Sequence, residues 1–574
     1  MQFRLNPRVI LALVLVTTVL GMSLGAVSAQ ERVPTITVHS VTQAERPIEY
    51  ETTRLVVENM RELGLDVEHR ALSLLQFFDE TWFSREEGKG RVEKPFQMTA
   101  WRMVGRPERS EPDEFTYNLF HSSVRDGGYN FIGYYNPEYD ALAETQRALT
   151  DPAERREIIC EAQQVIRNDM VNAYFLHPQT PQLVNTDVFN AASVVIQAGI
   201  GIQNFWNWIN IEPIGEERLI ITATTSNLNV LNPLEIAGDS PSRVTEIVWD
   251  RLMRTNPDGL PEPWAAESVV WEDSTHVVLT LREGMTWHDG LPVTSADAAY
   301  SFEAALAGTT QVDAEGNEFF RAEATDYYPF VSGITDIEII DDLTIRLSLA
   351  APNGAFETST LSKLNLIPKH IWEPIITELL ADDGADVDSI QEEIPIGSGP
   401  FKFVAYDVNE FALLEAHTDH WSAPKADGWL MNVLPNLEAM IGQIQSGEMN
   451  LLWEWPSDPA VLSDIAEAND HLSLFTETSI GFQYFAFNLR YAPFDNLAFR
   501  QAIAHVIPQQ FIIDNLYNGF AAPADSFVST ALGYWRECDE PLRTYEFTIE
   551  GARALLESAG YSWDDEGRLL YPAN

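Results

Sequence analysis

Apolar and polar residues recur along the chain with two different periods, which separate the expected helices from the expected strands. Residues 36–38 form a short apolar run. Residues 51–63 carry apolar side chains at helical spacing and are followed by Gly64. Residues 65–69 again have the pattern of a strand. This succession predicts a β-α-β unit and therefore an α/β fold.

Clear element boundaries also occur further along. Asp151 is a good N-cap, Pro152 suits the first position of a helix and Glu154 completes a capping box, so a helix is predicted to begin here. Residues 275–281 alternate as in a strand, and residues 297–306 return to helical spacing. We find no short repeat, heptad pattern or polar linker.

The first residues have the pattern of an export signal. Two arginines precede an apolar run over residues 9–20, and small residues at 27–29 form a cleavage site before Gln30. Residues 1–29 are therefore predicted to be a cleavable signal peptide, with an uncleaved membrane anchor as the alternative. No cysteine lies near the cleavage site, so no lipid anchor is expected.

Composition narrows the possible partners. The chain has 574 residues, 86 acidic against 36 basic side chains, a net charge of -50 and 45% hydrophobic residues. Two to four folded domains are expected at this length. Nucleic acid is not expected as a partner, because holding phosphates relies on clustered Lys and Arg. The acidic excess indicates a solvated surface suited to salt or acidity, or simply to solubility.

Catalytic motifs are absent from the sequence. There is no G-x-S-x-G elbow, H-E-x-x-H helix, P-loop or G-x-G-x-x-G turn. His288 and Asp289 are adjacent, but they lie in a turn where their side chains can satisfy backbone groups. The 11 histidines show no metal-binding spacing. We therefore expect no enzyme activity, catalytic residue, metal or cofactor, although a glycosidase-type carboxylate pair stays possible.

A set of motifs in a fixed order is more informative than any one of them. The stretches that carry this pattern are residues 229–234, 247–252, 256–259, 265–268, 281–297, 397–401, 420–421, 446–448, 487–488, 499–503 and 552–561. Together they closely resemble the family 5 bacterial extracellular solute-binding proteins, which are the peptide- and nickel-binding components of ABC importers. The resemblance implies two α/β lobes of the type II periplasmic-binding class, with ligand enclosed between them and a hinge joining them.

The order of the parts differs from that of the family. Residues 30–185 resemble the part of the second lobe that the family places last, whereas here they stand first. We therefore expect a circular permutant: residues 30–185 begin the second lobe, residues 186–480 form the first lobe with its extra subdomain, and residues 481–574 complete the second lobe. The alternative is an exported fragment of a rearranged gene. Hinge crossings are expected near residues 177–186 and 478–488.

The resemblance implies that the protein binds a solute and does not catalyse a reaction. The expected protein is a periplasmic or extracellular monomer that captures a peptide or related small solute and delivers it to the membrane permease of an ABC transporter. An oligosaccharide-binding protein of the same family is the first alternative, and an exported hydrolase is the less favoured one. A protein that presents its ligand to a sensor instead of a permease has the same sequence features.

Several expected ligand contacts follow from the resemblance. Trp101 is expected to lie along the cleft on a contact strand. Dipeptide-binding members have an aspartate three residues after this tryptophan, where this chain has Val104, and Asp113 could replace that aspartate only by loop movement. Arg102 and Arg106 could instead offer planar donors to a carboxylate or to sugar hydroxyls.

Further aromatic and polar side chains complete the expected site. Trp453 and Trp455 are spaced to share one face of a strand, as aromatic platforms would, although packing in the core is an equal possibility. Asn488, in one of the resembling stretches, is also expected among the ligand contacts. Core packing is favoured for Trp206 and Trp208.

The two cysteines of the chain, Cys160 and Cys538, would both belong to the second lobe. Export permits a disulfide, which would join the two pieces that permutation separates. A buried free thiol at Cys160 is the other possibility.

Overall fold

The structure is a computed structural model that describes residues 30–81, 96–105, 109–125, 130–226, 228, 232–235, 239–312, 318–322, 326–381, 395–453, 455 and 457–573. The predicted signal peptide and Arg106 lie outside these residues. Within the part of the chain that the structure describes, every helix is too short or too polar to cross a bilayer.

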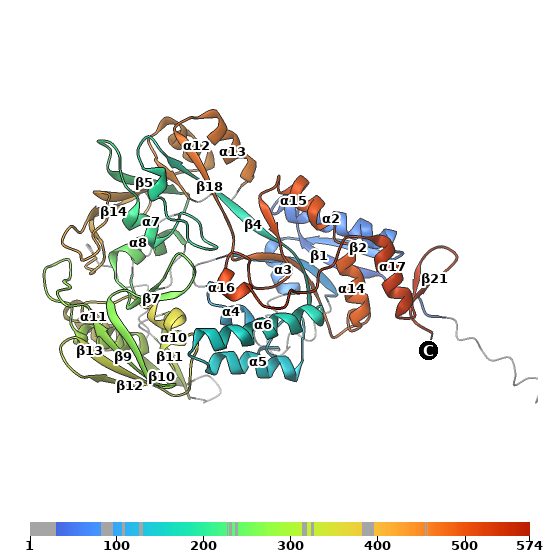
Figure 1. The fold of residues 1–574 in the computed structure, drawn as a ribbon, viewed down its shortest axis with the longest axis horizontal. Helices are drawn as coiled ribbons and strands as arrows, with labels where there is room; N and C mark the ends of the chain where they lie inside the picture. The colour runs from blue at the N-terminus through green and yellow to red at the C-terminus, as the bar shows by residue number, and fades with distance from the viewer. Residues whose placement is uncertain are drawn as a thin grey trace, which may run out of the picture.

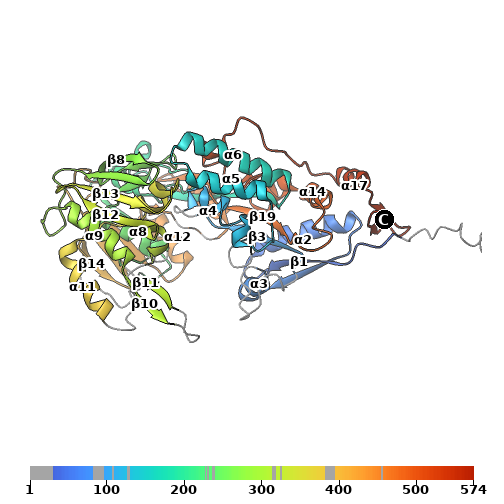
Figure 2. The same cartoon turned by 90° about the horizontal axis from the view of Figure 1, so that it is seen from below.

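The elements gather into two bodies that lie side by side in both views (Figures 1 and 2). The terminal body combines the first and last parts of the chain and contains β1–β3, β19, β20, α2–α6 and α14–α17. The central body contains the elements from α7 to α13. The strands β4 (Asn172–Asn185) and β18 (Leu472–Thr478) run between the two bodies.

The terminal body is built on one mixed sheet with the strand order β17-β4-β19-β3-β1-β2, and β18 and β20 pair with β4. The strands β1 (Ile36–Val41), β2 (Val67–Leu72) and β3 (Met98–Met103) are parallel to one another. The strand β19 (Phe482–Phe487) is antiparallel to β3 and to β4. The sheet therefore joins segments from both ends of the chain.

The predicted β-α-β unit is confirmed as β1, α2 (Pro47–Glu62) and β2. The helix begins four residues earlier than its apolar spacing suggested, because Pro47 occupies the first helical position, where its missing N–H costs nothing. Val56 and Met60 of this helix pack in a core that also contains Phe485 and Leu556 from the far end of the sequence. The two ends of the chain thus share one hydrophobic core.

The terminal body contains further elements, including the sheet strand β20. They are α3 (Leu74–Glu80), α4 (Asp113–Thr116), α5 (Pro137–Ala148), α6 (Pro152–Asn168), α14 (Leu497–His505), α15 (Gln509–Leu516), β20 (Ala521–Pro523), α16 (Gly533–Arg536), α17 (Ile549–Ser558), β21 (Ser562–Trp563) and β22 (Leu569–Leu570).

The helix α6 begins where its sequence predicted. The Asp151 carboxylate accepts hydrogen bonds from the amides of Ala153 and Glu154 at 2.8 and 3.1 Å. The reciprocal bond of a capping box, from the amide of Asp151 to Glu154, is not among the hydrogen bonds of the described residues, so that detail of the prediction is wrong.

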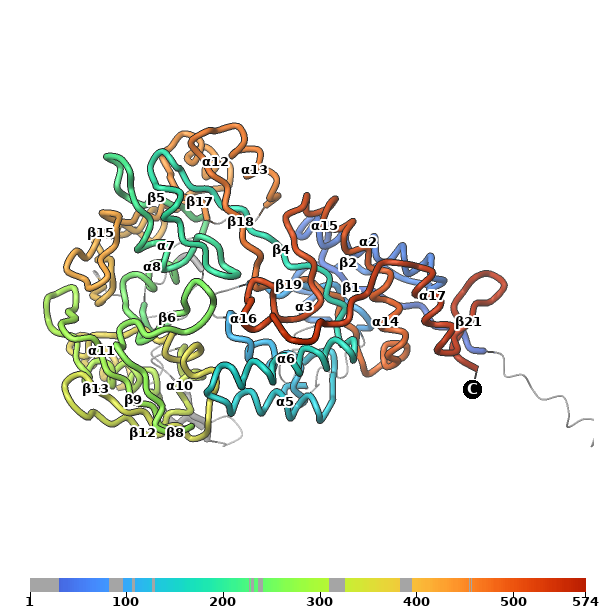
Figure 3. Tube along the Cα trace, viewed as in Figure 1, coloured from blue at the N-terminus to red at the C-terminus, as the bar shows by residue number. Residues whose placement is uncertain are grey.

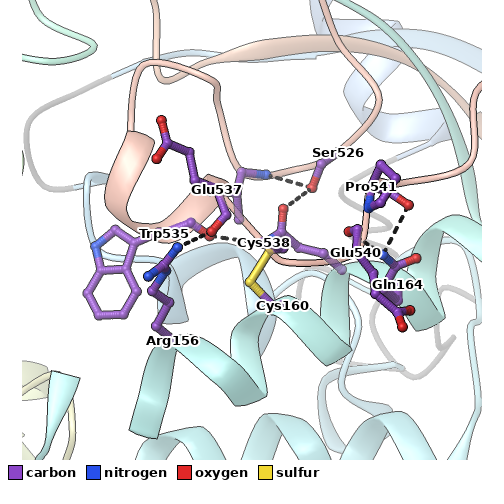
Figure 4. The surroundings of a disulfide bond; sticks show 11 residues. Arg156, Cys160, Gln164, Ser526, Trp535, Glu537, Cys538, Glu540 and Pro541 are labelled. Atoms are coloured by element: carbon purple, nitrogen blue, oxygen red, sulfur yellow. Dashed lines mark hydrogen bonds between the residues drawn. A yellow bond between two sulfur atoms is a disulfide. The ribbon is translucent and has the colours of Figure 1, made fainter. Parts of the chain in front are cut away.

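A disulfide joins Cys160 of α6 to Cys538, which follows α16 and lies 378 residues further along the chain. Figure 4 shows Arg156 and Gln164, one turn of α6 on either side of Cys160, donating hydrogen bonds to backbone carbonyls of the segment that carries Cys538. Of the two possibilities that the sequence left open, the structure has the bridge.

The central body contains two four-stranded sheets. One has the order β12-β13-β9-β8 and the other β14-β15-β16-β5. The strands of the central body are β5 (Leu219–Thr224), β6 (Met253–Thr255), β7 (Pro261–Pro263), β8 (Ala266–Asp273), β9 (His276–Leu281), β10 (Gly308–Val312), β11 (Glu318–Ala322), β12 (Ile334–Ile339), β13 (Thr344–Leu349), β14 (Phe401–Asp407), β15 (Phe411–Ala416) and β16 (Gly428–Val433). The short strand β17 (Leu451–Leu452) lies in the same part of the chain but pairs with β4 in the terminal sheet.

The helices of the central body are α7 (Phe205–Asn210), α8 (Asp239–Val248), α9 (Ser295–Leu306), α10 (Tyr328–Val331), α11 (Lys369–Ala381), α12 (Leu437–Ser446) and α13 (Pro459–Ala468). The strand and the helix predicted at residues 275–281 and 297–306 are confirmed as β9 and α9. Trp208 is fully buried in the core of this body. Trp206 packs against that core and donates from Nε1 to the carbonyl of Thr255 at 2.8 Å.

Candidate functional site

The carboxyl ends of the parallel strands β1, β2 and β3 lie at one edge of the terminal sheet. Ligands of open α/β sheets bind at this kind of edge, because loops and helix starts gather there while the strands themselves hold it rigid. The segment of β3 at this edge carries Trp101 and Arg102, two of the side chains expected to contact a ligand.

Trp101 is held by aromatic neighbours on one face of the sheet. Its ring stacks on Phe77 at a centroid distance of 4.8 Å and meets Phe78 edge-on at 5.0 Å. Both phenylalanines belong to α3, the helix that follows β2. Trp101 is only half-buried, so a fixed aromatic surface is left for a further apolar or planar group.

Arg102 lies on the opposite face of the sheet, within a cluster of polar side chains. Local sequence patterns did not predict this cluster. Nη1 of Arg102 is 3.4 Å from a carboxylate oxygen of Glu49 in α2. Gln483, the neighbour of Arg102 in β19, donates to the hydroxyl of Tyr517. Burial lowers the pKa of Arg102, although Glu49 opposes this effect. The four residues come from β3, α2, β19 and the end of α15, so only the fold brings them together.

The structure describes both Val104, which stands at the position of the missing aspartate, and Asp113, its expected replacement. Val104 is 44% exposed just after β3, and its carbonyl accepts a hydrogen bond from Arg109 at 2.7 Å. Asp113 instead forms a bidentate ion pair with Arg147, with both Nε and Nη2 at 2.8 Å from carboxylate oxygens. Asp113 is thus paired within the terminal body in this structure, and its contact with a ligand stays a prediction that requires the loop to move.

The two tryptophans near residue 454 do not form a common platform. The strand β17 ends at Leu452, so Trp453 and Trp455 do not share a strand face. Trp453 is 1% exposed in the main core of the central body, whereas Trp455 packs against the cluster around α12 and α13. This corrects the platform prediction, because a buried ring offers no surface to a sugar.

Asn488 is also a structural residue. Its side chain is buried, and Nδ2 donates to the carbonyl of Phe96 at 2.9 Å, while Oδ1 accepts from the amide of Arg490. Both ends of the amide are thus used to fix the end of β19, which corrects its assignment as a ligand contact.

The two bodies touch through a contact that sequence analysis missed. The guanidinium of Arg155 in α6 donates from Nη1 to the carbonyl of Gly354 in the central body at 3.1 Å. Arg155 is buried and also bonds Glu111 and the Gln146 side chain, so its position is fixed. In return, the amide of Gly354 donates to the carbonyl of Arg147.

Only glycine fits at this contact. A Cβ on Gly354 would lie 2.1 Å from the carbonyl oxygen of Leu149. The partners are 199 residues apart in sequence, so no local pattern could have found them. A small cavity of about 30 Å³ lies beside the contact and has walls from both bodies, including Pro152 and Trp535 on one side and Leu260 and Trp271 on the other.

A second cavity, of about 120 Å³, lies in the central body. It shares Thr358 with the cavity between the bodies, and Arg243, Glu246 and Arg251 also line it. Arg243 and Glu246 form a buried ion pair at 3.2 Å, one turn apart on α8. The central body therefore offers a polar hollow close to the place where the bodies meet.

The crossing strands are tightly packed where they pass between the bodies. The amide of Ser479 donates to the carbonyl of Pro178 at 2.8 Å, and the side chain of His177 is 2.9 Å from the carbonyl of Gly481. A Cβ on Gly105 would lie 2.8 Å from the amide nitrogen of Gly481. The segments in which hinge crossings were predicted thus form the link between β4, β18 and β19.

The adjacent residues His288 and Asp289 do not act as an acid–base pair. Burial lowers the pKa of His288 to about 3, and its ring nitrogens contact the carbonyl of Gly399 and the amide of Gly397. Asp289 is instead 2.8 Å from His370. The described residues bring no three His, Cys, Asp or Glu side chains together in a metal-binding arrangement.

Comparison with known proteins identifies the family to which this chain belongs. The model of the bacterial extracellular solute-binding proteins, family 5, matches residues 261–574, which is more than half of the chain. The chain therefore belongs to this family. Members of the family are extracellular or periplasmic solute-binding proteins.

Individual relatives match parts of the chain. A Brucella ovis protein that is named as an ABC transporter peptide-binding protein is 29% identical to this chain over 280 residues. The match covers 48% of this chain and 47% of that protein. The glutathione-binding protein GsiB of Salmonella paratyphi A is 23% identical over 345 residues, covering 60% of this chain and 61% of that protein. The chain thus spans about half the length of the first of these relatives.

Solved structures are also similar. The oligopeptide-binding protein AppA from Bacillus subtilis, in complex with a nonapeptide, matches with a TM-score of 0.42 at 18% identity, covering 62% of this chain and 66% of AppA.

Proposed function

We propose that this protein is the extracytoplasmic solute-binding component of an ABC importer, and that it captures a peptide or related small solute between its terminal and central bodies. The observation that carries the proposal is the arrangement of the two bodies, joined by paired crossing strands and touching at Gly354. Closure of two such bodies by a few hinge residues is an established way for a ligand to shift a protein between states. A membrane permease then recognises the closed form.

The ligand is proposed to lie at the carboxyl edge of β1, β2 and β3. Trp101 would contact an apolar or planar part of it, and Arg102 would attract a carboxylate, while Val104 removes the acid that would favour a free amino group. Peptides and related compounds are preferred over oligosaccharides, since burial of Trp453 leaves no pair of aromatic platforms.

The finer architecture is also a proposal. We infer a circularly permuted type II fold, in which residues 30–185 and 481–574 form the second lobe and residues 186–480 the first. Three observations support it: β3 pairs with β19 in one sheet, one core combines both ends of the chain, and the amide of Tyr571 donates to the carbonyl of Glu31 at 2.8 Å. Residues 1–29 are proposed to be the signal peptide.

The first experiment is a thermal-shift screen of residues 30–574 against di- to hexapeptides, glutathione, oligosaccharides and nickel chelates. A ligand that binds only the folded state raises the melting temperature by mass action. The hits are then titrated calorimetrically with the wild-type protein and with Trp101→Ala. Loss of this aromatic contact is expected to weaken binding by about tenfold or more.

Phe511→Ala is the matched control, because Phe511 is an exposed aromatic of the same body, 51% accessible, on α15. Its affinity should equal that of the wild type. A tight ligand that Trp101→Ala binds equally well would refute the proposed site. Catalytic turnover of a bound ligand, or a cooperative melt that no ligand in the screen shifts, would count against the function.

A further inference from the structure

A third cavity, of about 460 Å³, lies within the terminal body, away from the contact with Gly354. Its floor is made by Arg167 of α6 and by Tyr174 and Phe175 of β4. Residues 544–547, which precede α17, form one wall. Figure 3 shows the segment between α16 and α17, in dark red, crossing the terminal body. The volume is typical of sites for small molecules.

The cavity is lined by a buried guanidinium, that of Arg167, which makes no ion pair among the described residues. Arg167 is only 5% exposed. Among the described residues its guanidinium makes one hydrogen bond, from Nε to the carbonyl of Arg543 at 2.6 Å, and no ion pair. Burial lowers the pKa of Arg167, although the charge of Asp525 opposes this effect. A buried guanidinium is costly unless an anion or several acceptors satisfy it. Its two terminal nitrogens are thus the natural partners for an anion in the cavity.

The acids that line the cavity do not form an ion pair with Arg167. Asp525 also lines the cavity, but it forms an ion pair with Arg536 on the same wall. Glu546 lies at the exposed rim, where its backbone carbonyl is 2.7 Å from the ring of His505. The lining therefore carries two guanidinium groups and two carboxylates, of which Arg536 and Asp525 pair with each other and Glu546 is exposed to solvent, so Arg167 is the buried charge without an ion pair.

The other lining groups suit a flat or apolar body. The ring of Tyr545 lies over the Arg167 guanidinium, 4.7 Å from Cζ. Phe175 and Ile507 add apolar walls, and Phe547 is 49% exposed. Planar guanidinium groups match the geometry of a carboxylate, which can accept two parallel hydrogen bonds.

We propose that this cavity is a binding site for a small carboxylic acid with an apolar or aromatic body, whose carboxylate pairs with Arg167. It is separate from the cleft between the bodies and does not depend on which solute the cleft takes. The inference rests on the geometry of the cavity and on the buried, unpaired guanidinium.

The test uses residues 30–574 and three ligands of similar shape: benzoate, neutral benzamide and cationic benzylamine. Calorimetric titration is expected to give binding for benzoate, at least about tenfold weaker binding for benzamide, and none for benzylamine. Arg167→Gln should weaken benzoate by about tenfold or more. Arg543→Gln should stay within about twofold of wild type, since this exposed arginine stacks on Tyr545 but does not line the cavity.

If Arg167→Gln does not fold, the site can be tested on the wild-type protein instead. Its crystals are soaked with 4-bromobenzoate, and the bromine is located by anomalous diffraction. An anomalous bromine peak between Arg167 and Tyr545 supports the site. A peak elsewhere, no peak, or equal affinity for benzoate and benzamide overturns it. Benzoate should not compete with any peptide found in the thermal-shift screen, and competition would also overturn it. Failure of the solute-binding proposal would leave the benzoate result unchanged.

Discussion

Arg155 and Gly354 meet across the two bodies, with Nη1 of the arginine 3.1 Å from the glycine carbonyl oxygen. Arg155 is held by Glu111 and Gln146 on its own side, so the terminal body presents a rigid donor. Gly354 returns a hydrogen bond from its amide to the carbonyl of Arg147. This reciprocal contact stabilises the observed arrangement of the bodies.

Gly354→Ala should weaken this contact. The added Cβ would lie 2.1 Å from a backbone oxygen that cannot move aside freely, and overpacking of this kind costs about 1–3 kcal/mol. We expect the bodies to separate, so that the radius of gyration measured by small-angle X-ray scattering increases. Gly333→Ala is the control, because a Cβ there has nothing within 4 Å. Identical scattering from both variants would contradict the prediction.

Reduction of the disulfide should destabilise the protein. The bond closes a very long loop between Cys160 and Cys538, and such crosslinks stabilise by about 2–5 kcal/mol. A reductant is expected to lower the urea midpoint of the wild-type protein. The double variant Cys160→Ser/Cys538→Ser should start at the lower midpoint and not respond to reductant. Two alkylatable thiols in the native, unreduced protein would show that the bond is absent.

Acid should destabilise the fold through buried histidines. Burial lowers the pKa of His288 to about 3 and that of His177 to about 4. The unfolded chain, with histidine pKa values near 6.5, binds protons between about pH 6.5 and 4 that the folded chain does not. The free energy of unfolding therefore falls as the pH decreases through this range, by up to about 1.4 kcal/mol per pH unit for each histidine.

His288→Gln isolates one of these contributions. Between pH 6.5 and 4, the free energy of unfolding should depend less steeply on pH in this variant. The slope should decrease by up to about 1.4 kcal/mol per pH unit, the contribution of one proton. The slope of the wild-type protein, measured under the same conditions, is the reference. Equal slopes for His288→Gln and the wild type would refute the assignment to His288.

Reordering the chain tests the permuted architecture. A protein that begins at residue 219, runs to residue 573 and continues from residue 30 to residue 211 should fold, because residues 31 and 571 are already hydrogen-bonded neighbours. It should melt cooperatively and bind the same ligands as the natural order. An insoluble or non-cooperative product, alongside a well-folded natural chain, would argue against the permutation.

Local patterns predicted the local structure well. The β1-α2-β2 unit, the start of α6 at Asp151 and the helix α9 all follow from periodicity and capping, which depend on neighbouring residues. Burial of Trp208 was likewise expected.

Local sequence patterns could not predict the contacts between distant segments. Spacing suggested a shared face for Trp453 and Trp455, but the strand ends at Leu452 and tertiary packing separates the rings. Asp113 looked available because Arg147, its partner, is 34 residues away. The Arg155–Gly354 contact and the unpaired Arg167 likewise depend on the whole fold, so only the structure shows them.

The Cys160–Cys538 bond also determines how the molecule would carry a mechanical load. The entire central body lies between these two residues in the sequence, while both cysteines belong to the terminal body. Tension applied to the two ends of the chain would pass through the sulfur atoms and bypass everything in between. A molecule stretched from its two ends would therefore keep its central body intact while the bond holds.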